Sequence, residues 1–463
     1  MRVREHARRA RCGWLHVRGC RQGDRLSDRR ERSSPREPGA GGGLRRNPSG
    51  IDARRDIGPR DSRGEDRSRV HCTHSVVSRG SRVSPGETPG PAAAVDPFNA
   101  AITWLAEPLR GATDGPLAGR TLLVKDLIDT AGIRTTYGSR IYADHVPDRH
   151  ATVVQRVLDA GAVVVGKGNL PEFAWSVLGT NPWYGTVHNP LHPGKTTGGS
   201  SSGNAAALAA GLVDLGLGTD TGCSIRLPSA ACGTVGLKSR WGLLPLDGIF
   251  PLSPSFDTVG PMGRTVEDVA LLWSVLSGRA VPEPRLDGLT VGLLRRAPDL
   301  GDGRPTEKSD NAEAWVADLE QLGAHVIESA IPAACADTWP LFLHEAAWSH
   351  RATFPSRADE YAGTIRPKLE AAQRVTADAV VVARTAIDTW RAYEPEVDLY
   401  VSPCFAVDLP TEDADELEVR LPFSSFLRWV NLIGWAGLAV GNMQFVAPDD
   451  HTVLAAGLAW ECR

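Results

Sequence analysis

Beyond about residue 95, short apolar runs alternate with amphipathic stretches along the chain. Residues 121–124 and 162–165 are runs of four apolar or β-branched residues, a length and composition typical of buried strands. Residues 151–160, between these runs, place valines on one face at helical spacing and predict a helix. A helix between two buried strands predicts a layered α/β architecture.

The same pattern predicts further elements. Phe98, Ile102 and Leu105 recur at helical spacing, so ordered structure is expected to begin near Asp96 with a helical segment. The other expected elements are a small-residue helix at 204–212, a helix-like apolar run at 230–237, a strand entry at 286–292, covering helices up to about residue 394, and a buried strand at 397–401.

Two glycine-rich loops flank the small-residue helix, at 194–203 and 216–224. A Gly/Ser run is often a flexible linker. The first loop, however, leads directly into a packed helix, which favours a backbone held close to a ligand with amides presented at the helix start.

The second loop places the Ser224 hydroxyl beside consecutive turn amides that could form an oxyanion hole, although a β-turn with a capping serine is the simpler interpretation. A serine hydroxyl attacks an amide only with the help of a base. Lys125 ends the 121–124 strand, where desolvation would lower its pKa toward a proton-accepting form, whereas most lysines are solvated surface charges.

These segments resemble the amidase signature family. Residues 197–203 and 218–226 are similar to the signature itself, and residues 115–126, 166–173 and 255–268 are similar to the stretches around it. The resemblance implies an α/β fold: one amidase-signature domain with a mixed central β-sheet covered by helices on both faces. It is expected to span residues 96–463.

The resemblance also implies a chemistry. Ser224 would be the nucleophile, Ser200 a proton relay preceded by a cis Gly199–Ser200 bond, and Lys125 the base. The product would be an acid plus ammonia or an amine, released through a serine acyl-enzyme. The residues expected to support these three are the oxyanion-hole amides of Thr221, Gly222, Cys223 and Ser224, and the neighbouring side chains of Asp220, Arg226 and Ser201.

The composition of the chain limits the classes of partner that are expected. The net charge is −4, but residues 1–90 are rich in arginine and contain no lysine, and they predict a leader that is disordered or lies outside the working protein. Nucleic-acid binding is not expected because this segment lacks interleaved aromatics. The eight cysteines are scattered and predict neither a disulfide framework nor a zinc site, and no cofactor is implied.

No apolar signal region or membrane-length run is evident in the sequence, so no membrane association and a cytoplasmic location are expected. The expected partners are a small-molecule amide and, as an option, a second copy of the chain in a homodimer.

The sequence departs from the family pattern at several positions, and these departures suggest alternatives to an active amidase. Ser202, Asn204 and Cys223 stand where small residues are usual, and a positive φ at Cys223 would strain the oxyanion loop. The segment after Val440 is short and could damage the sheet. A catalytically impaired scaffold is therefore one alternative, and the A subunit of a tRNA-dependent amidotransferase, which passes ammonia to a partner, is another.

Overall fold

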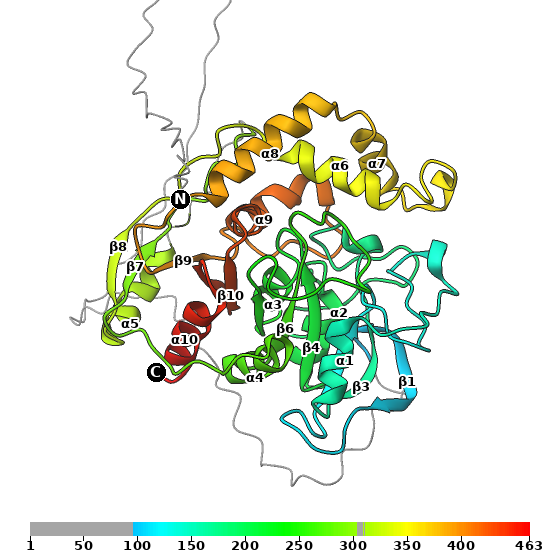
Figure 1. Ribbon diagram of the computed structural model, residues 1–463, viewed down its shortest axis with the longest axis horizontal. Coiled ribbons are helices and arrows are strands. Elements are labelled where there is room, and N and C mark those ends of the chain that lie inside the picture. The colour runs from blue at the N-terminus through cyan, green and yellow to red at the C-terminus, as the bar shows by residue number, and fades with distance from the viewer. Residues whose placement is uncertain (1–95, 303–308, 310) are drawn as a thin grey trace, which may run out of the picture. The chain divides into compact units, whose positions relative to one another are not determined.

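The computed structural model describes residues 96–302, 309 and 311–463, and the arginine-rich segment 1–90 lies outside them. The strands of these residues form one eleven-stranded mixed sheet in the order β1-β3-β2-β4-β6-β5-β10-β11-β9-β7-β8. Figure 1 shows β1 and β8 at opposite sides of this unit, as the strand order requires. The mixed sheet that the resemblance implied is confirmed.

The strands are β1 (Ala101–Arg110), β2 (Thr121–Lys125), β3 (Val163–Gly168), β4 (Leu215–Asp220), β5 (Val235–Lys238), β6 (Thr258–Gly263), β7 (Thr290–Leu293), β8 (His325–Glu328), β9 (Leu399–Pro403), β10 (Ala436–Val440) and β11 (Met443–Ala447). β2 runs parallel to β3 and β4, and β7 runs parallel to β8 and β9. The remaining pairings are antiparallel.

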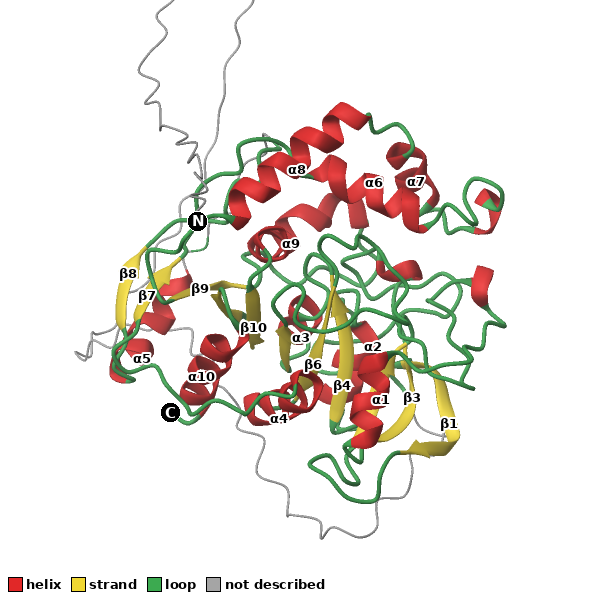
Figure 2. Ribbon diagram, in the orientation of Figure 1, coloured by secondary structure: helices red, strands yellow, loops and turns green. Residues whose placement is uncertain are grey.

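The α-helices are α1 (Thr152–Asp159), α2 (Ser202–Ala209), α3 (Arg226–Ala231), α4 (Val266–Ser277), α5 (Val316–Gln321), α6 (Trp339–Ser349), α7 (Arg366–Ala372), α8 (Ala377–Arg391), α9 (Glu416–Ile433) and α10 (Asp450–Glu461). Short 3₁₀ turns lie at Arg140–Tyr142, Glu172–Ala174, Asn311–Trp315 and Ala358–Glu360. Figure 2 shows α6, α7 and α8 grouped together, next to α9, as the predicted covering helices.

Side chains of β2 show how helices cover both faces of the sheet. Leu122 and Val124 pack with apolar residues of α1 and α4, whereas Leu123, between them, packs with residues of α2. Successive strand residues point to opposite faces, so α2 lies on the face opposite α1 and α4. This arrangement confirms the expected helix-covered sheet, with Lys125 at the end of a buried strand.

The predicted helical start at 98–105 is wrong, because this segment contributes to the edge strand β1, which pairs antiparallel with β3. The Asp96 carboxylate accepts hydrogen bonds from the Phe98 and Ala101 amides and from Trp104 Nε1, which holds the segment in an extended path. Hydrogen bonding to the edge of the sheet stabilises a strand here more than the helical spacing of three apolar side chains stabilises a helix.

The prediction of a helix-like run at 230–237 is also wrong, because α3 ends at Ala231 and the chain then enters β5. Gly233 between them has φ +65°, a conformation that suits glycine and ends the helix. Residues 235–238 complete the sheet between β6 and β10. A segment that is apolar throughout fits a buried strand as well as a helix.

The short passage after Val440 does not damage the sheet. Val440 of β10 pairs with Met443 of β11 across a two-residue turn made by Gly441 and Asn442. Gly441 has φ +56°, as tight hairpins require. Both strands stay paired to their outer neighbours, β5 and β9, so the short connection replaces a longer one without breaking the sheet.

Candidate active site

Lys125 ends β2 with its ammonium group fully buried. Its Nζ lies 2.7 Å from Ser200 Oγ and 2.8 Å from Thr219 Oγ1. Because β2 and β4 run parallel as neighbours, their carboxyl ends bring Lys125 and Thr219 to the same edge of the sheet. The structure therefore joins two of the three residues of the expected triad by a direct hydrogen bond.

Burial lowers the pKa of Lys125 to about 7, even though the nearby Asp220 carboxylate acts in the opposite direction. The physical cause is that the charged ammonium form loses hydration in the protein interior. Near neutral pH a large fraction of the side chain is the free amine, which can accept a proton from Ser200. The desolvation expected for this lysine is thus present.

Ser200 follows a cis Gly199–Ser200 peptide bond, as the family resemblance implies. Gly199 is required by packing, because a Cβ there would lie 2.5 Å from Ser176 O and 2.6 Å from Leu178 O. The next residue, Ser201, connects the two glycine-rich loops. Its amide donates to Ser224 O at 2.9 Å and its hydroxyl donates to Thr219 O at 3.3 Å.

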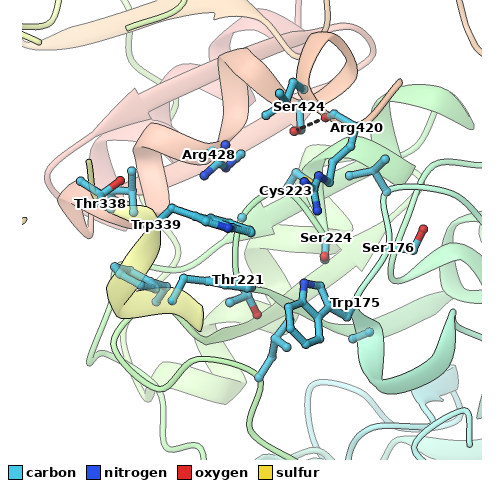
Figure 3. A pocket seen from close by; sticks show the side chains of 18 of the residues that line it. Trp175, Ser176, Thr221, Cys223, Ser224, Thr338, Trp339, Arg420, Ser424 and Arg428 are labelled. Carbon is cyan, nitrogen blue, oxygen red and sulfur yellow. Dashed lines mark hydrogen bonds between the residues drawn. The ribbon is translucent and has the colours of Figure 1, made fainter. Parts of the chain in front are cut away.

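Ser224 lies in the second glycine-rich loop, between β4 and α3, and lines a pocket. Figure 3 shows its hydroxyl pointing into this pocket. Within the described part of the chain, no hydrogen bond joins the hydroxyls of Ser200 and Ser224. The structure thus brings the third residue to the site but does not record its contact with the relay.

The backbone amides of residues 221–224 have no acceptor among the residues that the structure describes. All four residues line the same pocket as the Ser224 hydroxyl. Unpaired amides that face a pocket can stabilise a negative oxygen, which is what an oxyanion hole requires. The loop thus carries four amides without acceptors in residues that line the pocket, and their role as an oxyanion hole stays a prediction.

A buried ion pair fixes the ends of this loop. Arg226 Nε donates to Asp220 Oδ2 at 3.1 Å and Nη2 donates to Asp220 Oδ1 at 3.2 Å. Burial alone would raise the pKa of Asp220, but the Arg226 guanidinium keeps it below its usual value. Asp220 also accepts from the Ile225 amide at 3.1 Å, so the pair supports the turn that carries Ser224.

Sequence reasoning missed several partners of this loop. Thr219 contacts Lys125, and Asp257 accepts a 2.6 Å hydrogen bond from Thr221 Oγ1. Asn431 and Gln444 bind the Arg226 guanidinium at 2.7 Å and 3.1 Å. Asp257 lies in the stretch 255–268 that resembles the family, which could have indicated it, whereas the other three gave no local signal.

The strain anticipated at Cys223 is not present, because Cys223 is not among the residues with positive φ. Its side chain packs in an apolar cluster, and burial raises the pKa of the thiol to about 12. The other two departures also have partners. Ser202 Oγ donates to Gly198 O at 2.8 Å, and Asn204 Nδ2 donates to Leu123 O at 2.8 Å.

The pocket has a volume of about 150 Å³, enough for a small molecule. Its walls combine the Ser224 loop with aromatic and charged residues of more distant elements. The latter include Trp175, Phe256, Trp339, Phe342, Glu416, Arg420 and Arg428. Over the described residues, no group of three or more His, Cys, Asp or Glu side chains could hold a metal ion, and no helix is long and apolar enough to cross a membrane.

We expect Arg226→Met to lower the free energy of unfolding by about 3–5 kcal/mol, because Asp220 would keep a buried charge without its partner. Denaturant unfolding measures this change. Arg366→Met is the matched control, since Arg366 forms surface ion pairs with Asp359 and Glu370 and its loss should cost less than about 1 kcal/mol. Equal losses in the two variants would contradict the supporting role of Arg226.

Comparisons with known proteins agree with this geometry. The glutamyl-tRNA(Gln) amidotransferase A subunit of Natronomonas pharaonis is 42% identical over 252 residues, which are 50% of this chain and 58% of that protein. Its counterpart in Symbiobacterium thermophilum is 44% identical over 234 residues, 47% of this chain and 48% of that protein. The chain thus spans about half the length of these curated relatives.

Solved structures cover more of the chain. A crystal structure described as an amidase has a TM-score of 0.67 and 30% identity, covering 75% of this chain and 84% of its own. The peptide amidase of Stenotrophomonas maltophilia has a TM-score of 0.65 and 27% identity, covering 79% and 89%. The amidase family model matches residues 92–443. With that match over most of its length, the chain belongs to the amidase family.

Proposed function

We propose that this protein hydrolyses a carboxylic amide to an acid and ammonia or an amine, with Ser224 as nucleophile. The observation that carries the proposal is the buried contact between Lys125 and Ser200 at 2.7 Å, beside the loop of unpaired amides that holds Ser224. A lysine with a pKa of about 7 is matched to proton transfer near neutral pH.

In the proposed mechanism the Ser224 oxygen attacks the amide carbonyl carbon. Its proton passes to Ser200 as the Ser200 proton passes to Lys125, so the lysine becomes charged. The carbonyl oxygen becomes an oxyanion held by the amides of residues 221–224. Collapse of the tetrahedral adduct expels the amine, which takes the proton back from Lys125 through Ser200.

The resulting acyl-enzyme is an ester of Ser224. Water attacks this ester by the same route, giving its proton to Lys125 through Ser200. The carboxylic acid leaves, and the proton returns from Lys125 through Ser200 to the Ser224 oxygen, which restores its hydroxyl. Asp220 and Arg226 act in this scheme by fixing the loop, with Ser201 joining it to the first glycine-rich loop.

A second candidate function is that of an amidotransferase A subunit, which releases ammonia from an amide and passes it to a partner. The observation that favours it is the identity of 42% to 44% with proteins that carry this name. Under this alternative the purified chain alone would turn over slowly, and a partner protein would co-purify with it.

The test is release of ammonia or amine by the purified protein from glutamine and from simple aliphatic and aryl amides. We expect turnover of at least one simple amide without a partner. Turnover of glutamine alone, stimulated by a co-purifying partner, would favour the amidotransferase. No turnover with or without partners, in a protein that is folded, would indicate the catalytically impaired scaffold.

A further inference from the structure

The pocket beside Ser224 is rich in hydrogen-bond donors that lack acceptors. Trp175 is 5% exposed, and its Nε1 is buried without a hydrogen-bond partner among the described residues. Figure 3 shows the nitrogen of this indole turned toward Ser224. An N–H donor that is buried and unpaired is costly, so such a group indicates a place where a ligand oxygen binds.

Arg420, which is half-buried, is a second donor without an acceptor. Its guanidinium has no hydrogen bond or ion pair with the described part of the chain, and it lies 5.5 Å from the centre of the Trp339 ring. Figure 3 shows the side chain extending from α9 into the pocket toward Cys223 and Ser224. A guanidinium presents five N–H groups in a planar fork that fits a carboxylate with two parallel hydrogen bonds.

The acidic groups of the pocket wall have contacts other than Arg420, although Glu416 Oε1 accepts no hydrogen bond among the described residues. Glu416 lies 2.9 Å from Lys368 Nζ, with both side chains 8% exposed. Asp337 accepts a hydrogen bond from the Trp339 amide at 2.9 Å, at the start of α6. Asp302 also has a partner of its own. Neither Glu416 nor Asp337 forms an ion pair with Arg420, so the Arg420 charge stays available to a ligand.

Three hydroxyls of the wall have partners within the protein. Thr221 Oγ1 donates to Asp257, and Ser424 Oγ donates to the Arg420 carbonyl at 2.6 Å. Ser176 Oγ accepts from the Leu178 amide at 3.1 Å. Arg420 and Trp175 Nε1 are thus donors in the pocket wall that lack acceptors among the described residues, and Arg420 is positively charged, which favours an anionic ligand with acceptor oxygens.

We propose that Arg420, with Trp175 Nε1 as a further donor, forms a subsite for a carboxylate carried by the substrate, so that the preferred substrate is an amide of a dicarboxylic acid whose other end is free. This inference rests on the proposed function and deepens it. The Arg420 guanidinium lies within cation–π range of the Trp339 ring, 5.5 Å from its centre.

The test compares succinamate with succinamide, which are nearly equal in size and differ by one carboxylate. We expect the wild-type protein to show a higher kcat/KM for succinamate. Arg420→Ala should lower the ratio of the two kcat/KM values by about 10- to 100-fold, mainly through KM, since a charge-assisted pair is lost. Arg420→Lys should retain part of the preference because it keeps the charge but not the fork.

Arg351→Ala is the matched control, because Arg351 stacks on Trp348 at 3.7 Å and does not line the pocket. It should leave the ratio of the two substrates as in the wild type. Equal kcat/KM values for the two amides in the wild type would overturn the subsite while leaving the proposed hydrolysis intact. So would an equal loss on both amides in Arg420→Ala.

A binding measurement separates the two proposals if neither amide is hydrolysed. Calorimetric titration with succinate needs no turnover and reports the subsite alone. We expect succinate to bind the wild type about 10-fold or more tightly than it binds Arg420→Ala. Absence of hydrolysis with this difference present would refute the proposed function only. Equal binding by both proteins would refute the subsite.

Discussion

Ser224→Ala is expected to lower amide turnover by on the order of 10⁴-fold or more, because the other hydroxyl of residues 221–224, that of Thr221, is engaged as a donor to Asp257. The fold should remain intact, since the Ser224 side chain makes no hydrogen bond within the described residues. Initial rates on the best amide of the panel measure the loss, and the melting temperature reports the fold.

Cys223→Ala is the control for this variant. The thiol lies next to the nucleophile in sequence, but its pKa is raised to about 12 by burial, so almost none of it is thiolate at neutral pH. Cys223→Ala should keep most of the turnover. If this variant loses activity while Ser224→Ala retains it, the nucleophile has been assigned to the wrong residue.

Turnover is expected to rise with pH through about 7 and to stay high into mild alkali. Below the pKa of about 7 the Lys125 side chain is a charged ammonium, which cannot accept the proton of Ser200. Each pH unit below that value therefore lowers the rate about tenfold. Profiles of kcat and kcat/KM between pH 5 and 9 measure this limb.

The Lys125→Arg variant tests whether Lys125 acts as a base or only supplies a positive charge. Arginine keeps the charge at every working pH and cannot take up a proton, so this variant should lose about 10²- to 10⁴-fold in kcat. Wild-type turnover in Lys125→Arg, with an unchanged pH profile, would exclude Lys125 as the base.

Among the buried groups that interact with Lys125 or with Asp220, Lys238 and Asp257 titrate near the same pH and need controls. Burial lowers the pKa of Lys238 to about 7 and raises the pKa of Asp257 to about 6. Lys238→Met and Asp257→Asn should both keep the limb near pH 7, whatever their effect on the rate. Loss of the limb in either variant would assign it to that residue.

The position of Lys125 followed from the sequence, because the run at 121–124 is short and comes after the Gly115–Pro116 break, which together favour a strand over a helix. The two glycine-rich loops were equally legible, since each flanks a helix of small residues. The direct contact between Lys125 and Ser200 agrees with this interpretation. The local sequence pattern was sufficient to predict these elements, because residues close together in the sequence determine their structure.

Contacts between distant segments were not predictable. Arg420 reaches the pocket from α9, and nothing in the sequence around it indicates which cavity its side chain enters. Gln444, on β11, supports the Ser224 loop through a hydrogen bond to Arg226. The edge strand β1 was misjudged because its pairing depends on a partner about sixty residues away.

The hydrogen bonds of Arg226 to Leu427 O, Asn431 and Gln444 have a consequence for biosynthesis. A chain emerging from the ribosome completes Lys125, Ser200 and Ser224 long before it completes α9 and β11. The Arg226 guanidinium, which supports the Ser224 loop, has all three of these acceptors only after residue 444 has been made. We therefore expect nascent chains that have not reached residue 444 to lack the full set of hydrogen bonds that supports the Ser224 loop.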